Sequence, residues 1–425
     1  MSILTFVVLP LALVVLGVPI FLVLLIATAA GILYLGIGSL HAIHIAIFGS
    51  FDSFPLLAIP LFIFAGDLMA RGGIAERLIA LIMSIIGGIR GSLPVATIAS
   101  ASAFGAMSGS SVACVAAVGR LTLPALERNG YGRSFSVSLI AATGVIDVII
   151  PPSIPMIIYG ITAQQSVTQL FLAGIVPGLI IAASLSIYVT ARAMIKNSAR
   201  GDRPRMSVII PAFKRSIWAL FAPVLVLGGI YGGAFTPTEA AGVACVYAII
   251  VSALIHGELS LADIWRIALD SGQLIAQLMV LVAAAGAYGW LVTAGGIGAQ
   301  LVSYVAELQL ETWLLLLVIN FLLLIIGSVL EPPAALLILV PLLMPIVLQA
   351  GIDPIHFGLV VTVNLAIGMF LPPFGLNLFA AHALFQTPLP ELYRGVIPFL
   401  FIYIAILLLL TYIPAITLAP LAWMR

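Results

Sequence analysis

The stretch 105-GAMSGSSVACVAAVG-119 interrupts a strongly apolar chain with glycines and serines. It contains no leucine or isoleucine, although both residues are abundant elsewhere in the chain. Three hydroxyl side chains lie close together in it, those of Ser108, Ser110 and Ser111. A segment of this kind predicts a break in a membrane helix, where the backbone polar groups meet protein, water or a ligand.

The composition places the chain in a lipid bilayer. Hydrophobic residues make up 63% of its 425 residues and charged residues 7%, and the mean hydropathy is +1.30. A water-soluble protein of this length needs more polar surface, and a net charge of +1 argues against a nucleic-acid partner. Apolar runs of roughly 20 residues predict an all-α polytopic membrane protein. They lie at 4–26, 28–48, 132–158, 170–194, 217–235, 238–256, 273–293, 313–326, 358–385 and 395–418.

Basic residues predict the orientation of the chain. Seven of the sixteen lysines and arginines fall between Arg192 and Arg215, and the positive-inside rule places that loop in the cytoplasm. Counting crossings outward from it puts both termini outside. The same count puts five further basic residues inside: Arg71, Arg77, Arg90, Arg128 and Arg133.

The chain contains an internal repeat. The segment 71-RGGIAERL-78 returns as 294-AGGIGAQL-301, and 151-PPSIP-155 returns as 372-PPFGL-376. Between these landmarks, Gly105 matches Gly327 of 327-GSVLEPPAA-335, and the three offsets are 223, 221 and 222 residues. The sequence therefore predicts two copies, roughly 50–195 and 273–425, preceded by two helices and joined by two more.

The second copy is expected to be inverted in the membrane. Five crossings separate the starts of the two copies, provided that 71–90 lies at the interface as an amphipathic helix. Its counterpart, 294–311, carries Glu307 and Glu311 but no lysine or arginine, as the opposite face of a membrane predicts. Inverted repeats with broken helices are typical of secondary transporters.

Each copy is expected to contain a re-entrant helical hairpin and a broken crossing helix. The hairpins are 92–124 and 312–350, and the Gly/Pro-interrupted segments are Gly105–Ser111, Gly144–Pro155, Gly327–Pro333 and Gly368–Gly375. Carbonyl groups freed by such breaks suit Na⁺, whereas half-helix N-termini and hydroxyl groups suit a carboxylate. Small residues also mediate ordinary helix packing, which is the preferred interpretation of Ser92, Ser100 and Ser102.

Four acidic residues lie within apolar surroundings, where charge is costly and usually functional. Asp147 and Glu331 fall inside broken segments, which suggests ion coordination or protonation. Asp67 has Arg71 one helical turn later and is interpreted as half of an interfacial ion pair. Glu239 in 236-TPTE-239 fits a capping box.

The motifs together resemble those of a known family. The segments GAMSGSSVA, IIPPSIPMIIYG, FTPTEAAGVACVYA, GSVLEPPAA and PPFGLNLF occur in fixed order over essentially all 425 residues. In this they resemble the large membrane subunit of the tripartite ATP-independent periplasmic (TRAP) transporters. The resemblance implies an elevator-type architecture and Na⁺-coupled import of an organic acid, with Na⁺ at two or more sites. It also implies two partners, a small four-helix membrane subunit and a periplasmic substrate-binding protein, and a location in a bacterial or archaeal inner membrane.

The resemblance also assigns site residues. One set is expected to hold Na⁺: Gly105, Ser108, Ser110, Gly144, Asp147, Gly327, Glu331 and Gly368. A second set is expected to contact the substrate: Ser108, Ser111, Pro152, Ser153, Pro373 and Asn377. Two positions depart from the family pattern, because Leu371 stands where a threonine is usual and Asp147 where a small residue is expected. These departures leave open whether backbone oxygens alone form the second site or the coupling ion is a proton.

The same resemblance suggests how the chain divides into working parts. The expected parts are N-terminal scaffold helices (1–50), a scaffold helix with the first interfacial arm (51–91), transport half 1 (92–195), the cytoplasmic loop with scaffold helices and the second arm (196–311), and transport half 2 (312–425). Two alternatives remain: a stand-alone Na⁺- or H⁺-coupled anion transporter, and a proton-relay subunit of an energy-converting complex that uses Asp67, Asp147 and Glu331. No arginine lies in the broken segments, so the sequence does not identify the organic acid.

Overall fold

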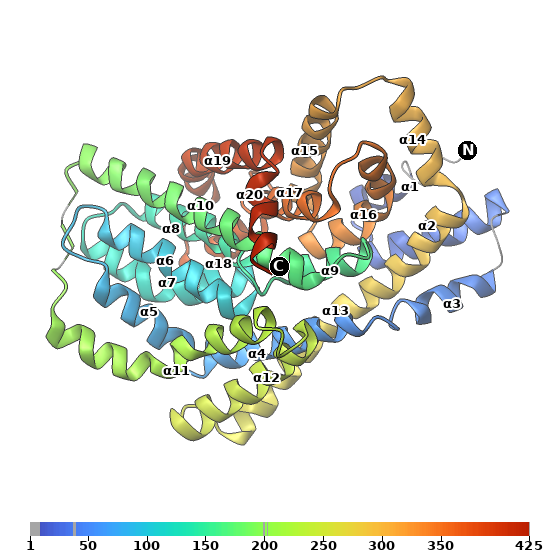
Figure 1. Cartoon of the computed structure of the whole chain (residues 1–425). Helices are drawn as coiled ribbons and strands as arrows, with labels where there is room; N and C mark the ends of the chain where they lie inside the picture. The colour runs from blue at the N-terminus through green and yellow to red at the C-terminus, as the bar shows by residue number, and fades with distance from the viewer. Residues whose placement is uncertain (1–8, 37–39, 199, 202, 425) are drawn as a thin grey trace.

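The computed structural model describes residues 9–36, 40–198, 200, 201 and 203–424, and every regular element in these ranges is a helix. Eight helices or continuous helical runs are long and apolar enough to cross a membrane. The chain is thus an all-α polytopic membrane protein, as predicted. In Figure 1, α3 (Leu40–Gly49), α4 (Ala58–Arg71) and α13 (Leu261–Ala294) lie along one diagonal of the molecule.

The two copies contain seven corresponding α-helices in the same order, and the first copy also contains two short 3-10 helices, η2 and η3. The first comprises η2 (Phe54–Leu57), α4 (Ala58–Arg71), α5 (Ile74–Ile85), α6 (Ser92–Ser108), α7 (Ser111–Arg128), α8 (Arg133–Gly144), η3 (Val145–Val148), α9 (Ile154–Thr162) and α10 (Val167–Ile195). The second comprises α13 (Leu261–Ala294), α14 (Ile297–Glu307), α15 (Thr312–Val329), α16 (Pro332–Gln349), α17 (Pro354–Gly368), α18 (Leu376–Phe385) and α19 (Leu389–Tyr412). The predicted duplication and both helical hairpins, α6–α7 and α15–α16, are confirmed.

The other described helices lie before η2, between α10 and α13, and after α19. They are α1 (Leu9–Val15), α2 (Ile20–Leu35), α3 (Leu40–Gly49), α11 (Met206–Tyr231), α12 (Pro237–Ile249) with its π-helical extension η4 (Ile250–Ile255), α20 (Ala415–Leu418) and η5 (Ala419–Met424). Corresponding turns have matching backbones. Gly73 and Gly296 both have positive φ angles, 74° and 63°, and both Pro–Pro pairs, 151–152 and 372–373, contain a cis peptide bond.

The N-terminal helices differ from the sequence prediction. Continuous spans were expected at 4–26 and 28–48, whereas α2 ends at Leu35, and Gly36 follows it in the left-handed conformation. At the repeat offset, α3 and α4 together correspond to the single 34-residue helix α13. The first copy therefore includes α3 in addition to the elements from η2 onward, and the counterpart of α13 in it is broken around Pro55, which occupies an early position of η2.

At the centre of the molecule, helices of each copy pack against helices of the other copy. The second arm of each hairpin packs against the short helix of the other copy's broken segment: α7 against α18, and α16 against α9. A Cβ atom added to Gly119 of α7 would lie 2.3 Å from the Phe385 ring of α18. On the other side, the Tyr159 hydroxyl of α9 donates to the Pro354 carbonyl oxygen at 2.6 Å. The broken segments are consequently held in place by both copies.

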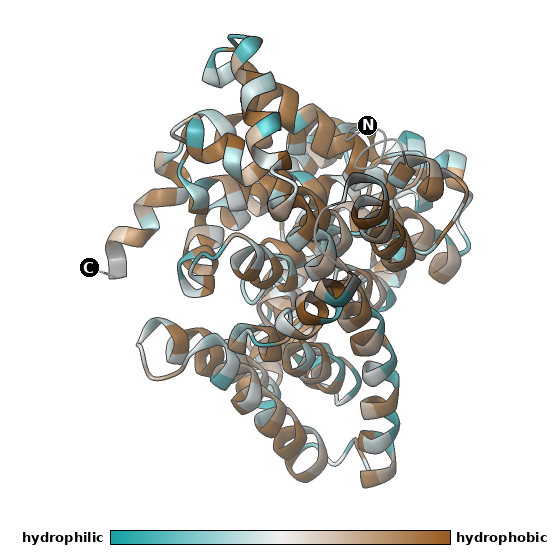
Figure 2. Ribbon diagram, turned by 90° about the vertical axis from the view of Figure 1, so that its right-hand side faces the viewer, coloured by the Kyte–Doolittle hydropathy of each residue, from teal (hydrophilic) through white to brown (hydrophobic). Residues whose placement is uncertain are grey.

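Basic residues gather at one end of the described molecule. Arg90 donates to the Asn197 side chain at 2.7 Å and forms an isolated backbone bridge with Arg200. Lys214 and Arg215 line a cavity together with Arg77. Positions widely separated in sequence therefore lie on the same side, as the predicted orientation requires. Figure 2 shows hydrophobic residues along the lengths of the helices.

Two interpretations of acidic residues can be checked directly. Glu239 forms the predicted capping box with Thr236 at the start of α12. The predicted pairing of Asp67 with Arg71 is wrong: Arg71 binds Asp270 at 2.6 Å, and Asp67 accepts a hydrogen bond from Ser271 at 2.6 Å. Both partners, Asp270 and Ser271, lie on α13. The packing of α13 against α4 brings them within hydrogen-bonding distance of Arg71 and Asp67.

Labelling of single cysteines tests the orientation. In a background in which the buried Cys114 and Cys245 are replaced by alanine, we expect Arg203→Cys to react with an impermeant maleimide only in inside-out vesicles. Glu307→Cys, at the end of α14, should react only in intact spheroplasts, because the second copy is inverted. Labelling of both positions from the same side would contradict the inverted arrangement.

Candidate ion and substrate site

The stretch around Gly105 forms the tip of the first hairpin. Helix α6 ends at Ser108, Gly109 adopts a φ of 65°, and α7 begins at Ser111. A Cβ atom at Gly109 would lie 2.9 Å from the Pro152 carbonyl oxygen. Glycine is needed here both for the left-handed backbone and for the close approach of the tip to the Pro–Pro turn.

A second glycine brings each tip against its broken helix. A Cβ atom on Gly105 would lie 2.8 Å from the Asp147 Cα atom. In the other copy, a Cβ atom on Gly368 would lie 2.2 Å from the Gly327 carbonyl carbon. Asp147 and Gly368 each precede a Pro–Pro pair by four residues. Asp147 is therefore the structural counterpart of Gly368, which explains why a small residue was expected at its position.

The Asp147 side chain is fully buried, with an exposed fraction of 0%. Neither carboxylate oxygen has a side-chain donor among the described residues, and the backbone N–H of Gly109 at the hairpin tip approaches the carboxylate. A buried carboxylate without a compensating charge costs several kcal/mol or more, so in proteins such a group is protonated, paired or bound to a cation. Asp147 thus marks the first broken segment as a place for a proton or a metal ion.

Asn377 connects the first site to the second copy. Its amide nitrogen donates to the Ser111 hydroxyl oxygen at 2.6 Å and to the Ala141 carbonyl oxygen at 3.1 Å. A Cβ atom on Gly144 would lie 3.2 Å from that nitrogen. Ser111, Gly144 and Asn377 thus lie together, although they come from α7, α8 and α18. The Asn377 side-chain oxygen is buried and has no donor among the described residues.

The second site contains a residue that the sequence prediction missed. Asn364 lies one turn before Gly368 and donates to the Asn320 backbone and side-chain oxygens, both at 3.0 Å. Asn320 in turn donates to the Thr411 hydroxyl oxygen at 2.9 Å. The Asn364 side-chain oxygen is buried without a donor in the described part of the chain. The signal in the sequence was a lone asparagine in the apolar run 357-FGLVVTVNLAIG-368.

The unpaired side-chain atoms at the broken segments share one property. The two oxygens of Asp147 and the amide oxygens of Asn364 and Asn377 are all acceptors. A hard cation such as Na⁺ is bound by carboxylate, amide and carbonyl oxygens, whereas an anion would need donors. Within the described residues, no group of three or more His, Cys, Asp or Glu side chains could hold a metal ion. The arrangement therefore fits a cation held largely by neutral oxygens.

The other residues predicted to bind ions are less closely grouped. Ser108 is buried, and its hydroxyl oxygen accepts from the Ser110 backbone nitrogen at 3.2 Å, which stabilises the tip itself. Ser110 is half-buried. Glu331 precedes α16 at the second tip, and its side chain is exposed and does not cap the helix. The structure therefore does not enclose Glu331 with Gly327 and Gly368.

The other residues predicted to bind substrate lie in three environments. Ser153 is buried and acts locally, since its hydroxyl donates to the Val148 carbonyl oxygen at 2.5 Å and accepts from the Met156 nitrogen at 3.4 Å. Pro152 is buried beneath the first tip, whereas Pro373 is exposed. Ser111 and Asn377 of the predicted set are hydrogen-bonded to each other.

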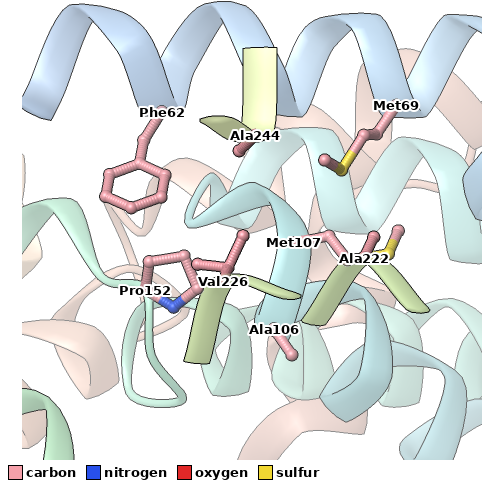
Figure 3. A pocket seen from close by; sticks show the side chains of 8 residues that line it. All are labelled: Phe62, Met69, Ala106, Met107, Pro152, Ala222, Val226 and Ala244. Atoms are coloured by element: carbon pink, nitrogen blue, oxygen red, sulfur yellow. The ribbon is translucent and has the colours of Figure 1, made fainter. Parts of the chain in front are cut away.

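The first tip faces three helices outside the hairpins across a narrow apolar gap (Figure 3). Ala106, Met107 and Pro152 lie on the tip side, opposite residues of α4, α11 and α12. These opposing residues are Phe62, Met69, Ala222, Val226 and Ala244. The gap leaves a volume of about 0 Å³ for water. Apolar contact, rather than a polar substrate cavity, therefore fills this face of the tip.

Comparisons with known proteins agree with this architecture. Residues 7–416 match the family model described as "Tripartite ATP-independent periplasmic transporter, DctM component". The chain is 39% identical, over 91% of its length and 90% of the relative's, to the C4-dicarboxylate TRAP transporter large permease protein DctM of Pseudomonas aeruginosa. It is 36% identical to the 2,3-diketo-L-gulonate TRAP transporter large permease protein YiaN of Escherichia coli, over 96% of both chains.

Two further similarities concern a longer relative and a solved structure. The chain is 41% identical to the isethionate TRAP transporter permease protein DctMQ of Oleidesulfovibrio alaskensis, covering 95% of this chain and 64% of that protein. The YdaH transporter of Alcanivorax borkumensis has a similar fold, with a TM-score of 0.65 over 88% of this chain and 89% of that one. Its sequence identity is 14%, so this likeness concerns the fold alone.

Substitution of a contact glycine tests the geometry of the site. Gly368→Ala should destabilise the protein by about 2 kcal/mol or more, because the added methyl group meets the Gly327 backbone, which no side-chain rotation can relieve. Gly242→Ala in α12 is the matched control, since a Cβ atom there meets nothing within 4 Å. Thermal unfolding of both purified variants measures the difference. Equal unfolding temperatures would contradict the tip contact.

Proposed function

This chain belongs to the DctM family of the tripartite ATP-independent periplasmic transporters, and we propose that it imports a small organic acid across the bacterial inner membrane, coupled to Na⁺. The family match and the eight candidate spans make it an integral membrane protein. The proteins to which it is similar are transporter permeases, so we treat it as a permease subunit rather than an enzyme.

The observation that carries the proposal of cation coupling is the set of buried acceptors without donors. Asp147 could be satisfied by either a proton or Na⁺. The Asn364 amide oxygen does not take up a proton near neutral pH, so only a metal ion or an unrelated donor could satisfy it. This difference favours Na⁺ over H⁺ at the second site, which contains Gly327, Gly368 and Asn364.

The proposed substrate class rests on helix termini and on the relatives. Four half-helices begin at the breaks, at Ser111, Ile154, Pro332 and Leu376. The first N–H groups of α7, at Ser111, have no acceptor within the helix and would attract an anionic group, whereas Pro332 and Pro333 supply no N–H at the start of α16. C4-dicarboxylates and 2,3-diketo-L-gulonate, which appear in the relatives' names, are carboxylates. We place the substrate carboxylate between the tips, near Ser111, Pro152 and Pro373.

The proposed motion is that of an elevator. The hairpins α6–α7 and α15–α16, with the broken segments, would form the moving body. Helices α4, α11, α12 and α13 would form the scaffold. The apolar gap in Figure 3 supports this division. Apolar contacts lack the directional bonds that would hold the two parts in a single relative position.

The proposed partners follow from the family. They are a small membrane subunit and a periplasmic binding protein that delivers the substrate. The relative named DctMQ, of which this chain covers 64%, is consistent with a second membrane component. The two alternatives from the sequence differ from this proposal. A stand-alone anion transporter would need no binding protein, and a proton-relay subunit would use Asp67 together with Asp147 and Glu331.

Uptake measurements test the function. In proteoliposomes that contain this chain and the small membrane subunit, we expect uptake of a radiolabelled organic acid only when its binding protein and an inward Na⁺ gradient are both present. Uptake without the binding protein would favour the stand-alone transporter. Uptake that persists when K⁺ replaces Na⁺, and follows the pH gradient instead, would overturn Na⁺ coupling.

Asp147→Asn tests the first cation site with little change of shape. Na⁺ at 100 times its dissociation constant stabilises a protein by about 2.7 kcal/mol, so wild type should unfold at a higher temperature in NaCl than in choline chloride. We expect this difference to shrink in Asp147→Asn, because the buried carboxylate charge is lost. Asp67→Asn is the control, since Asp67 bonds Ser271 outside the site. An unchanged Na⁺ effect in Asp147→Asn would exclude Asp147 as a ligand.

A further inference from the structure

A cavity lined by basic residues lies apart from the ion and substrate site. It occupies about 420 Å³ between α5, α11 and the turn that follows η4. Its lining residues are Arg77, Lys214, Arg215, Trp218, Ile255 and His256. None of them belongs to the hairpins or to the broken segments, so the transport site does not account for this group of charges.

Two of the basic side chains have no acidic partner. Arg77 forms a salt bridge with Glu258 at 2.5 Å and donates to the Gly73 carbonyl oxygen at 2.8 Å, so its charge is compensated. Burial, together with the nearby Arg77 charge, lowers the pKa of His256, which keeps its ring neutral near pH 7. Lys214 and Arg215 are exposed, and no salt bridge joins them to any described residue. The cavity therefore carries uncompensated positive charge.

The elements around the cavity are held together by hydrogen bonds. The Ser216 hydroxyl of α11 donates to the Arg77 carbonyl oxygen of α5 at 2.7 Å. The Tyr247 hydroxyl of α12 donates to the Trp218 carbonyl oxygen at 2.5 Å. Both bonds cross between helices within two residues of a lining position. The cavity is consequently part of a fixed arrangement rather than a chance grouping of surface side chains.

Apolar side chains border the cavity on one side. Trp218 and Ile255 are 42% exposed and line it directly. Helix α11 continues from Trp218 with exposed Phe221 and Val224, and Leu254 of η4 is 79% exposed. Tryptophan is enriched where helices leave the hydrocarbon core. The cavity therefore has a basic end and an apolar edge, as a ligand with an anionic head and hydrocarbon chains would require.

We propose that this cavity binds the phosphate headgroup of an anionic phospholipid at the cytoplasmic face of the membrane. Lys214 and Arg215 contact the phosphate, and the acyl chains lie along Trp218, Phe221 and Ile255. Basic pockets between membrane helices on the cytoplasmic side commonly bind such headgroups. Inorganic phosphate could also bind at the basic end of the cavity, but it would leave the apolar edge without a ligand.

Lipid binding to the purified, delipidated chain tests the proposal by native mass spectrometry. The probes are phosphatidylglycerol and phosphatidylcholine with identical acyl chains, and inorganic phosphate. We expect wild type to prefer phosphatidylglycerol. K214Q/R215Q should bind it roughly 30-fold more weakly, from about fivefold for each basic group near an anionic surface. K214R/R215K should retain binding, and R203Q/R205Q, which removes two charges from the same loop, should bind as wild type does.

Each outcome decides the proposal. Equal binding of phosphatidylglycerol by wild type and K214Q/R215Q would overturn it, as would equal binding of the two lipids by wild type. Displacement of phosphatidylglycerol by inorganic phosphate at equal concentration would show a free-phosphate site instead. If K214Q/R215Q loses its fold, as judged by its unfolding temperature, the single variant K214Q makes the same comparison with an expected loss of about fivefold.

Discussion

The close contact of a hairpin tip with the backbone of a broken helix is the constraint on which the rest of the structure depends. Gly105 meets the Cα atom of Asp147, and Gly327 meets the backbone of Gly368. Backbone contacts of this kind cannot be relaxed by a change of side-chain rotamer. The helices around them must therefore hold the tips in place, and each copy does so with a helix of the other: α18 packs on α7, and α9 packs on α16.

The inverted repeat makes the two contacts alike in shape but not in charge. In the first copy, the residue four positions before the Pro–Pro pair is Asp147, a buried carboxylate without a side-chain donor among the described residues. In the second copy that residue is Gly368, and the nearby unpaired oxygen belongs to the neutral amide of Asn364. A proton can neutralise the first site but cannot satisfy the second. The two halves of the proposed site would therefore place different demands on a bound ion.

Much of this arrangement is predictable from sequence, because it rests on residues with unusual backbone properties. Glycine and proline reveal the tips, the breaks and the repeat, and 236-TPTE-239 reveals a helix start through local hydrogen bonds alone. Contacts between distant segments are not predictable in this way. Arg71 binds Asp270, 199 positions away, rather than Asp67 on the next turn, and the hydrogen bond of Asn377 with Ser111 crosses between the copies. The N-terminal helices were misplaced because hydropathy alone does not show that the helix ends before Gly36 within an apolar run.

Hydrogen bonds join the helices that surround the first tip to one another, whereas apolar side chains form their contact with the tip. Polar bonds tie α12 and α13 to α4 and the η2 turn before it: Thr238 donates to the Phe54 carbonyl oxygen at 3.3 Å, Cys245 to that of Leu61 at 3.0 Å, and Ser271 to Asp67 at 2.6 Å. Across the gap shown in Figure 3, α4 and α12 present Phe62, Met69 and Ala244 to the tip. Hydrogen bonds fix one register, whereas apolar contact is non-directional and depends mainly on the area buried. In the proposed elevator motion, displacement would therefore occur at the apolar boundary with the tip, where contacts are non-directional, rather than between the helices that hydrogen bonds join.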